Sequence, residues 1–163
     1  MVLSLKSLFL NEADQISKTF EMAVSSAELA DDFRLCGPIF VEAVLKSQTG
    51  TIFFSAKVSF EAVHPCDRCL EDVKDSYRYF FEHKVVRSLS DDSEDYIVAE
   101  NDELDLKQLL LEDISLNLPT KVLCFPDCKG MCPVCGENLN KHSCGCNKDR
   151  IDPRLAVLKQ LID

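Results

Sequence analysis

Polar and apolar residues alternate through the centre of the chain. From Thr51 to Val63 an apolar side chain stands at every second position, and the same alternation returns between Val73 and Val85. Because successive side chains of a strand point to opposite faces, this period predicts two half-buried strands. Apolar patterns within 16–24 and 37–46 predict two more, the second of them followed by the turn-forming sequence Ser47-Gln48-Thr49-Gly50. Together they predict an antiparallel meander of about four strands.

From Leu104 the period changes to that of a helix. Asp102 or Asp105 can cap its first turn, and Leu118-Pro119 ends it. The apolar residues at helical spacing are Leu106, Leu109, Leu110 and Ile114. A short helix is also predicted over 26–33, and another over 152–162, where Asp caps and Pro takes the first helical position.

These patterns predict an α+β protein. An antiparallel β-sheet meander with a packed helix is followed by a small cysteine-rich, zinc-binding tail and a C-terminal helix. We place the sheet domain at residues 1–119, with its helix near 104–117, and the zinc-binding tail with its short C-terminal helix at residues 120–163.

Charge is negative overall and unevenly distributed. The net charge is −10, with ten acidic and two basic residues in 87–119 but five acidic and seven basic residues in 120–163. Phosphate binding depends on clustered Lys and Arg, so this balance disfavours nucleic-acid contact over the whole surface. A local basic face in the tail is still compatible with it. Its candidate contacts to RNA or a partner are Lys129, Lys141, Lys148, Arg150 and Arg154.

The cellular compartment decides how the cysteines are interpreted. No stretch approaches the roughly 18 apolar residues of a membrane helix, and the first residues show no signal peptide. We therefore expect a cytoplasmic protein that does not contact a membrane. The reducing cytosol does not maintain a disulfide scaffold, so nine cysteines point to metal ligands. Two four-cysteine zinc sites would use eight of them, leaving Cys36 as a bystander.

The eight candidate ligands divide in more than one way. One division puts Cys132, Cys135, Cys144 and Cys146 on one zinc, because the loop between them is short and costs little entropy to close. The other zinc then takes Cys66, Cys69, Cys124 and Cys128. An alternative groups Cys124, Cys128, Cys132 and Cys135, which crowds four ligands into a short segment. A single zinc with the other cysteines free is a third option.

Both proposed sites are structural in character rather than catalytic. A catalytic zinc keeps an open position and often has a His or Glu ligand, whereas His64, His83 and His142 are scattered along the chain. His64 and His142 adjoin cysteines and could substitute as ligands, but we expect them to be solvated, and His83 to be an ordinary strand residue. Hydrolase and phosphate-loop motifs are missing, and Cys66–Cys69 lies between antiparallel strands rather than at a redox-active helix start. The sequence therefore predicts no enzymatic activity and no small-molecule substrate.

Several of these motifs together resemble the YceD family, the large ribosomal RNA subunit accumulation proteins. The similarity rests on the run from Asp127 to Asn140, Cys144-Gly145-Cys146, the segment from Ile151 to Leu158, Cys66-Asp67-Arg68-Cys69-Leu70 and Leu116-Asn117-Leu118-Pro119. It spans about residues 35–160. It implies a bacterial or plastid protein that is needed for normal levels of large-subunit ribosomal RNA and has no enzymatic activity. No transit peptide is visible, which favours a bacterial cytosol.

Two mechanisms are compatible with that implied role. In one, a ribosome-assembly factor touches ribosomal RNA or a ribosomal protein of the pre-ribosomal large subunit through its zinc-ordered tail. In the other, a zinc-stabilised adaptor uses its acidic surface to bind a basic ribosomal protein or an RNA-processing enzyme. A zinc hydrolase is the least favoured class.

Overall fold

The computed structural model describes residues 1–25, 28–29, 33–88 and 96–146. The chain divides into two compact units. The first comprises Met1–His64 and Val73–Thr120, and the second comprises Pro65–Asp72 and Lys121–Asp163. The second unit therefore takes in the short segment between the two longest strands of the first.

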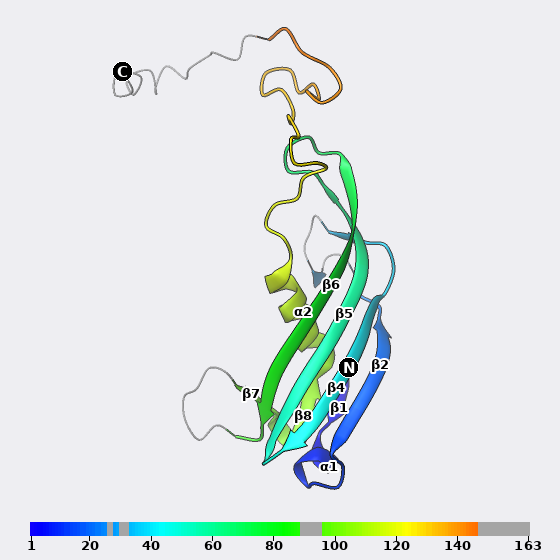
Figure 1. Ribbon diagram of the computed structural model, residues 1–163, viewed down its shortest axis with the longest axis vertical. Coiled ribbons are helices and arrows are strands. Elements are labelled where there is room, and N and C mark those ends of the chain that lie inside the picture. Colours follow the sequence, from blue (N-terminus) through cyan, green and yellow to red (C-terminus); the bar gives the residue numbers. More distant parts are fainter. Residues whose placement is uncertain (26–27, 30–32, 89–95, 147–163) are drawn as a thin grey trace, which may run out of the picture. The chain divides into compact units, whose positions relative to one another are not determined.

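A six-stranded sheet forms most of the first unit (Figure 1). Its four main strands follow one another in the chain and pair in that order: β2 (Gln15–Met22), β4 (Ile39–Gln48), β5 (Thr51–Pro65) and β6 (Asp72–Val86). Two short strands complete it, with β3 (Arg34–Leu35) pairing with β5 and β7 (Tyr96–Val98) lying parallel to β6.

A tight turn sets the register between β4 and β5. Gln48 pairs with Thr51, which leaves Thr49 and Gly50 as the two central residues of the turn. Both have positive φ, 50° and 83°. Two positive φ values in a two-residue loop match the right-handed twist of the flanking strands. The pairing places Ile52, Phe54 and the alternate residues after them on the buried face of the sheet.

Helix α2 (Leu106–Asn117) buries one stripe of side chains, Leu106, Leu110 and Ile114. The Asp105 carboxylate caps it by accepting hydrogen bonds from the Lys107 and Gln108 amides. The terminal ammonium of Met1 and these two amides lower the pKa of Asp105. The strand that leads into the helix, β8 (Glu103–Asp105), pairs with β1 (Val2–Ser4). The unit also contains the short helix α1 (Lys6–Phe9) and the single 3₁₀ turn η2 (Glu100–Asp102).

The expected α+β class, the antiparallel meander and the long helix are confirmed. The helix begins at Leu106 rather than Leu104, because Leu104 belongs to β8. The sequence pattern did not indicate β1, β7 and β8, since three residues are too few for a period to be recognised. The helix expected at 152–162 lies outside the described residues, as does most of the one expected at 26–33. In the part of the chain that the structure describes, no helix has the length and apolar character to cross a bilayer.

Candidate metal centres

Four cysteines from two distant parts of the chain meet in the second unit. They are Cys66, Cys69, Cys124 and Cys128, whose Sγ atoms all lie within 4.8 Å of one another. The Sγ atoms of Cys66 and Cys128 are 3.8 Å apart, and those of Cys69 and Cys124 are 3.5 Å apart. These separations are too long for disulfide bonds, and all nine cysteines are free. We call these four residues the first cysteine group.

Backbone and side-chain hydrogen bonds hold the two halves of the first cysteine group together. The Asp67 amide donates to the Val122 carbonyl at 2.9 Å, and the Asp67 carboxylate accepts from the Val122 amide at 2.5 Å. The Arg68 guanidinium donates to the Cys128 carbonyl at 2.7 Å. The segment before Cys124 is therefore fastened directly to the turn that carries Cys66 and Cys69.

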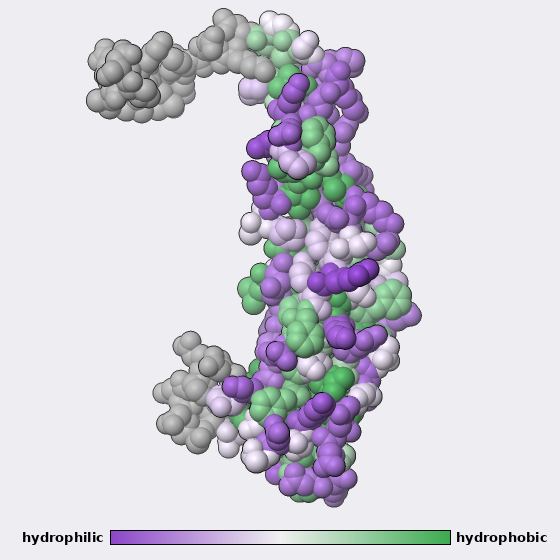
Figure 2. All heavy atoms as spheres, viewed as in Figure 1, coloured by the Kyte–Doolittle hydropathy of each residue, from purple (hydrophilic) through white to green (hydrophobic). Residues whose placement is uncertain are grey.

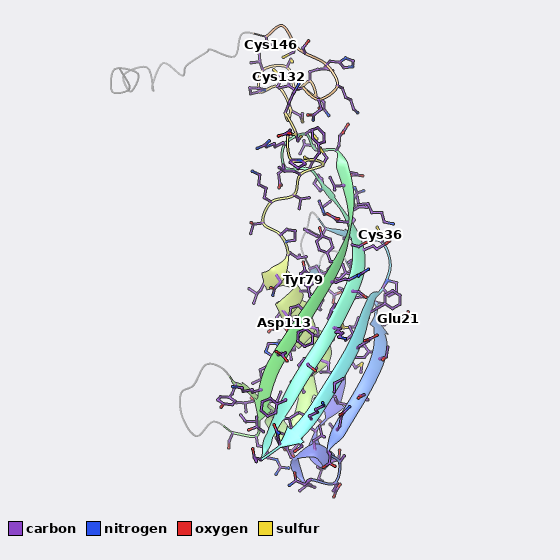
Figure 3. All side chains as sticks on the ribbon, in the orientation of Figure 1. Glu21, Cys36, Tyr79, Asp113, Cys132 and Cys146 are labelled. Atoms are coloured by element: carbon purple, nitrogen blue, oxygen red, sulfur yellow. The ribbon has the colours of Figure 1, made fainter. Side chains whose placement is uncertain are left out.

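The remaining four cysteines form a second, local cluster, which we call the second cysteine group. It consists of Cys132, Cys135, Cys144 and Cys146, again with all Sγ atoms within 4.8 Å of one another. Figure 3 shows Cys132 and Cys146 close together in this small unit. The two groups correspond to the first of the divisions considered from the sequence. Cys36 belongs to neither group and lies exposed in the first unit.

The two Cys-x-x-Cys turns have the same backbone hydrogen bonds although they share little sequence. The amide of Cys66 donates to the carbonyl five residues on, and the amide of Leu70 donates back to Cys66. Cys132 and Gly136 repeat both bonds, at 2.8 and 2.9 Å in each turn. The fifth residue has a left-handed backbone in each, with φ of 59° at Leu70 and 75° at Gly136. Glycine adopts this conformation at little cost, whereas Leu70 adopts it against its steric preference.

These turns aim backbone N–H groups at the first sulfur of each pair. Burial opposes ionisation of Cys66, but amides of Arg68, Cys124 and Cys69 outweigh it and lower its pKa to about 6. Amides of Cys135 and Val134 likewise lower the pKa of Cys132 to about 6. Each group thus holds at least one thiol with a lowered pKa.

Other thiols of the same groups resist ionisation. Burial, together with the sulfur of Cys69, raises the pKa of Cys124 to about 12. The sulfur of Cys135, together with burial, raises the pKa of Cys146 to about 12. Four sulfurs in such a small space cannot all be anionic unless a cation lies among them, and metal binding removes the protons from coordinating thiols.

The geometry fits one tetrahedral metal ion in each group. Ligand bonds of about 2.3 Å to four thiolates place the sulfurs about 3.8 Å apart. Moreover, every buried side chain in the described part of the second unit is a cysteine: Cys66, Cys69, Cys128 and Cys132. That part of the unit contains no buried Leu, Ile, Val or Phe, so ligand–metal bonds are what can hold it together.

Asn140 connects the two cysteine groups. It lies in the loop between Cys135 and Cys144, yet its Nδ2 donates to the Cys128 Sγ of the first group at 3.2 Å. Its Oδ1 accepts from the Lys129 amide at 2.7 Å. Burial raises the pKa of Cys128, but the hydrogen bond from Asn140 Nδ2 to its sulfur is among the contacts that lower it overall. The sequence motifs did not indicate this role, because it depends on a contact between loops.

Gly130 and Met131 form a second connection between the groups. The Met131 amide donates to the Arg68 carbonyl at 2.9 Å, so the residue just before the second Cys-x-x-Cys turn is hydrogen-bonded to the first turn. Gly130 has a φ of 74°, and a Cβ atom there would lie 2.9 Å from that same carbonyl oxygen. Only glycine permits this close approach.

Replacing Asn140 by Asp should weaken metal binding by the first cysteine group about 10- to 100-fold, as is usual for residues that orient ligands. The change keeps the side chain's size and its acceptor to Lys129 but removes the donor to the Cys128 sulfur and adds a negative charge. Titration with Co²⁺, followed by thiolate charge-transfer absorption and competed with a chelator, measures the affinity. Asn117→Asp, in α2, serves as the control and should bind like wild type. Equal affinity of Asn140→Asp and wild type would contradict this role.

The three histidines lie outside both cysteine groups. His64 was expected to be solvated, which is wrong, because it is almost fully buried and its Nε2 lies 2.8 Å from the Tyr77 hydroxyl. It follows the buried alternation of β5, which carries it into the first unit's core. His83, in β6, is a strand residue as expected and lies 2.7 Å from the Asp113 carboxylate. His142 is exposed, as expected.

The structure describes two of the five basic residues proposed as contacts. The side chain of Lys129 is exposed, and its ammonium forms no ion pair with a described residue. Lys141 forms a salt bridge with Glu71. Lys148, Arg150 and Arg154 lie outside the described residues. Of the two described lysines, Lys129 is therefore the one whose charge is available to a partner.

Comparisons with known proteins agree on one family. The model of the family described as "Large ribosomal RNA subunit accumulation protein YceD" matches residues 54–162. The chain is 28% identical over 159 residues to the uncharacterized protein YlbN of Bacillus subtilis (strain 168), covering 94% of this chain and 92% of that protein. No solved structure matches the chain.

Two further relatives match over less of their length. The uncharacterized protein Rv2926c of Mycobacterium tuberculosis is 29% identical over 123 residues, which cover 72% of this chain and 59% of that protein. The chloroplastic large ribosomal RNA subunit accumulation protein YCED homolog 1 of Arabidopsis thaliana is 36% identical over 59 residues, which cover 36% of this chain and 18% of the plant protein. The family match takes in more than half of the chain and reaches from β5 through all eight clustered cysteines. From this match we conclude that the chain belongs to the YceD family.

Proposed function

We propose that this protein is a non-enzymatic, cytoplasmic factor that supports the accumulation of large-subunit ribosomal RNA. The observation that carries the proposal is the family match, whose description names that role and whose extent includes both cysteine groups. The plant relative has the same role in its name. A non-enzymatic role agrees with the chemistry of the groups, because four thiolates complete a tetrahedral shell and leave no position for a substrate.

We further infer that each cysteine group binds one structural Zn²⁺ ion. Tetrahedral sites made of four sulfurs are typical of zinc and of iron–sulfur centres. A multinuclear cluster places inorganic sulfide and several irons between the cysteines, which requires a wider space than sulfurs within 4.8 Å of one another offer. A single d¹⁰ ion without redox chemistry suits a site whose role is to hold loops together.

The proposed partner is the precursor of the large ribosomal subunit, contacted through ribosomal RNA or a ribosomal protein. Lys129, Lys141, Lys148, Arg150 and Arg154 are the proposed contacts in the second unit. The alternative is an adaptor that binds a basic ribosomal protein or an RNA-processing enzyme through its acidic surface. The net charge of −10 favours this alternative, since it repels free RNA at long range.

In cells that lack the protein, we expect large-subunit ribosomal RNA to fall relative to small-subunit RNA, and the wild-type chain to restore the ratio. A sucrose gradient should show the tagged chain sedimenting with large-subunit precursors. Reversal of Lys129 and Lys148 to Glu should abolish this co-sedimentation if the second unit is the contact face. An unchanged ratio of the two RNAs in cells without the protein would contradict the proposed function.

A matched charge control separates a local contact from a global electrostatic effect. Lys6 and Lys18 are exposed lysines of the first unit, and their reversal to Glu changes the net charge by the same amount. We expect this variant to sediment like wild type. Loss of co-sedimentation in both double variants would show that only the net charge matters and would contradict a contact through Lys129 and Lys148.

A further inference from the structure

No described residue forms a hydrophobic covering over one face of the first unit's sheet, and this face carries exposed aromatic rings. Along β4, β5 and β6 one set of alternating side chains is buried in the core, and the other set points away from it. We call the second set the outer face. It includes Phe40, Phe53 and Phe80, which are 50%, 40% and 56% exposed. Figure 2 shows apolar side chains lying among hydrophilic ones over these strands. A repeated phenylalanine at positions that alternation assigns to solvent indicates a binding surface.

The outer face also gathers positive charge, although the protein as a whole is acidic. Its cations are Lys46, Lys57, Lys74, Arg78 and Lys84, and its carboxylates on the same three strands are Glu42, Glu61, Asp72 and Glu82. Five cations and four carboxylates leave a net charge of +1, against −10 for the chain. Within the described residues only Lys74 of these cations forms an ion pair, with Glu61 at 2.7 Å. Four cations are therefore available to a ligand.

Aromatic rings and cations meet in two hollows on this face. A hollow of about 640 Å³ is lined in part by Phe40, Phe80, Lys57 and Arg78. A second hollow of about 920 Å³ is lined in part by Phe53, Tyr96, Lys46 and Lys84. The Lys84 ammonium lies 5.6 Å from the centroid of the Tyr96 ring. Each hollow thus combines two of these aromatic rings and two cations with one carboxylate, Glu42 in the first and Glu82 in the second.

This combination has the chemistry of a single-strand nucleic-acid groove. An unpaired base stacks on an aromatic side chain, and a cation nearby binds the phosphate that follows it. Paired bases of a duplex are already stacked on each other, so a duplex cannot place its bases on these rings. We propose that the outer face binds single-stranded RNA, with bases on Phe40, Phe80 and Phe53 and phosphates on the cations of the two hollows. This inference rests on the proposed function, because it identifies a second surface, besides the basic residues of the second unit, through which the protein would contact ribosomal RNA.

The affinity should be modest and strongly dependent on salt. Phosphate contacts by the four available cations predict a slope of about −3 in a plot of log K against log salt concentration, at roughly −0.7 per contact with a single strand. The negative charge elsewhere on the chain weakens long-range attraction, so binding is best measured at low ionic strength.

The test uses the full-length chain and a fluorescently labelled single-stranded oligoribonucleotide of mixed sequence, with binding followed by anisotropy. Phe40→Ala and Phe80→Ala should each weaken binding about fivefold or more, since base stacking contributes about 1–3 kcal/mol. Both rings are exposed, so their loss removes little core packing. Arg78→Ala should weaken binding and make the salt slope shallower. Leu116→Ala, at an 84% exposed apolar position of α2, is the matched control and should bind like wild type.

Three results would overturn the proposal. One is unchanged binding by the phenylalanine variants, and another is equally tight binding of a duplex of the same sequence. The third is a pair of results: the wild-type chain does not bind the oligoribonucleotide, and the Phe40→Ala variant no longer binds a ribosomal protein that the wild-type chain binds. This pair would make the outer face a protein-binding surface. The measurement is separable from the proposed function. The variants could lose oligoribonucleotide binding while cells without the protein keep normal ribosomal RNA levels. That result would support RNA binding by the outer face and contradict the proposed function.

Discussion

Removal of metal by a strong chelator under reducing conditions should unfold the second unit and leave the sheet of the first unit folded. Structural zinc contributes about 10–16 kcal/mol to small domains of this kind. The described part of the second unit has buried cysteines but no buried aliphatic or aromatic side chain to replace that contribution. The first unit has its own continuous apolar core and should not depend on the metal.

Amide hydrogen exchange before and after chelation measures this effect segment by segment. We expect protection to disappear from 65–72 and 121–146 and to persist in β4, β5 and α2. Elemental analysis of the reduced, dialysed protein should find about two zinc ions per chain, at four cysteines for each structural site. A metal content near zero in folded protein, or unchanged protection of 121–146 after chelation, would contradict the zinc assignment.

Single cysteine substitutions should separate the two cysteine groups. Cys66→Ser should reduce the metal content from about two ions per chain to about one, because a structural zinc needs all four ligands. It should also expose the amides of 65–72 together with those of 121–128, since both segments hold the same ion. Cys132→Ser should have the same effect on metal content but expose mainly 132–146. Exchange and elemental analysis on both variants test this difference.

Cys36→Ser is the control for both variants. Cys36 is exposed and lies in neither cysteine group, so its replacement should change neither the metal content nor the exchange. If Cys66→Ser exposed only its own turn and left 121–128 protected, the long-range first group would be wrong. Partial loss of amide protection at 128–131 in Cys132→Ser is compatible with two separate metal sites, because Asn140 and Met131 connect the two groups.

The local pattern of residues was enough to predict the main elements and the chemistry of the cysteines. Alternation over ten or more positions identified β4, β5 and β6, because burial on one face depends only on the two-residue period of a strand. An aspartate cap, Asp102 or Asp105, could be named from its place before the apolar stripe, and the structure shows that Asp105 is the cap. The Cys-x-x-Cys spacing itself brings two sulfurs to one side of a tight turn, so both turns were recognisable as ligand pairs.

The exposed rings of the outer face show where such reasoning falls short. Phe53 and Phe80 lie at strand positions where the alternation predicts a solvent-exposed, polar side chain. This departure from the pattern was the only sign of the outer face in the sequence. Which cations lie beside them depends on the pairing of β4 with β5 and on the strands next to them. Periodicity within a single strand contains no information about its neighbours, so the sequence led to the basic residues of the tail and not to this face.

The first cysteine group is the other feature that only the tertiary structure decides. Cys69 and Cys124 are separated by 55 positions and Cys66 and Cys128 by 62, so nothing in their local spacing selects one pairing over another. The hydrogen bonds of Asp67 with Val122 and of Arg68 with Cys128 select it, because they bring a hairpin turn and the segment after α2 into one unit. The second cysteine group is local, and its short loop favoured it from the sequence without excluding the other divisions. Sequence spacing determines contacts whose closure costs little entropy, whereas distant contacts form only when the folded chain has brought both segments together.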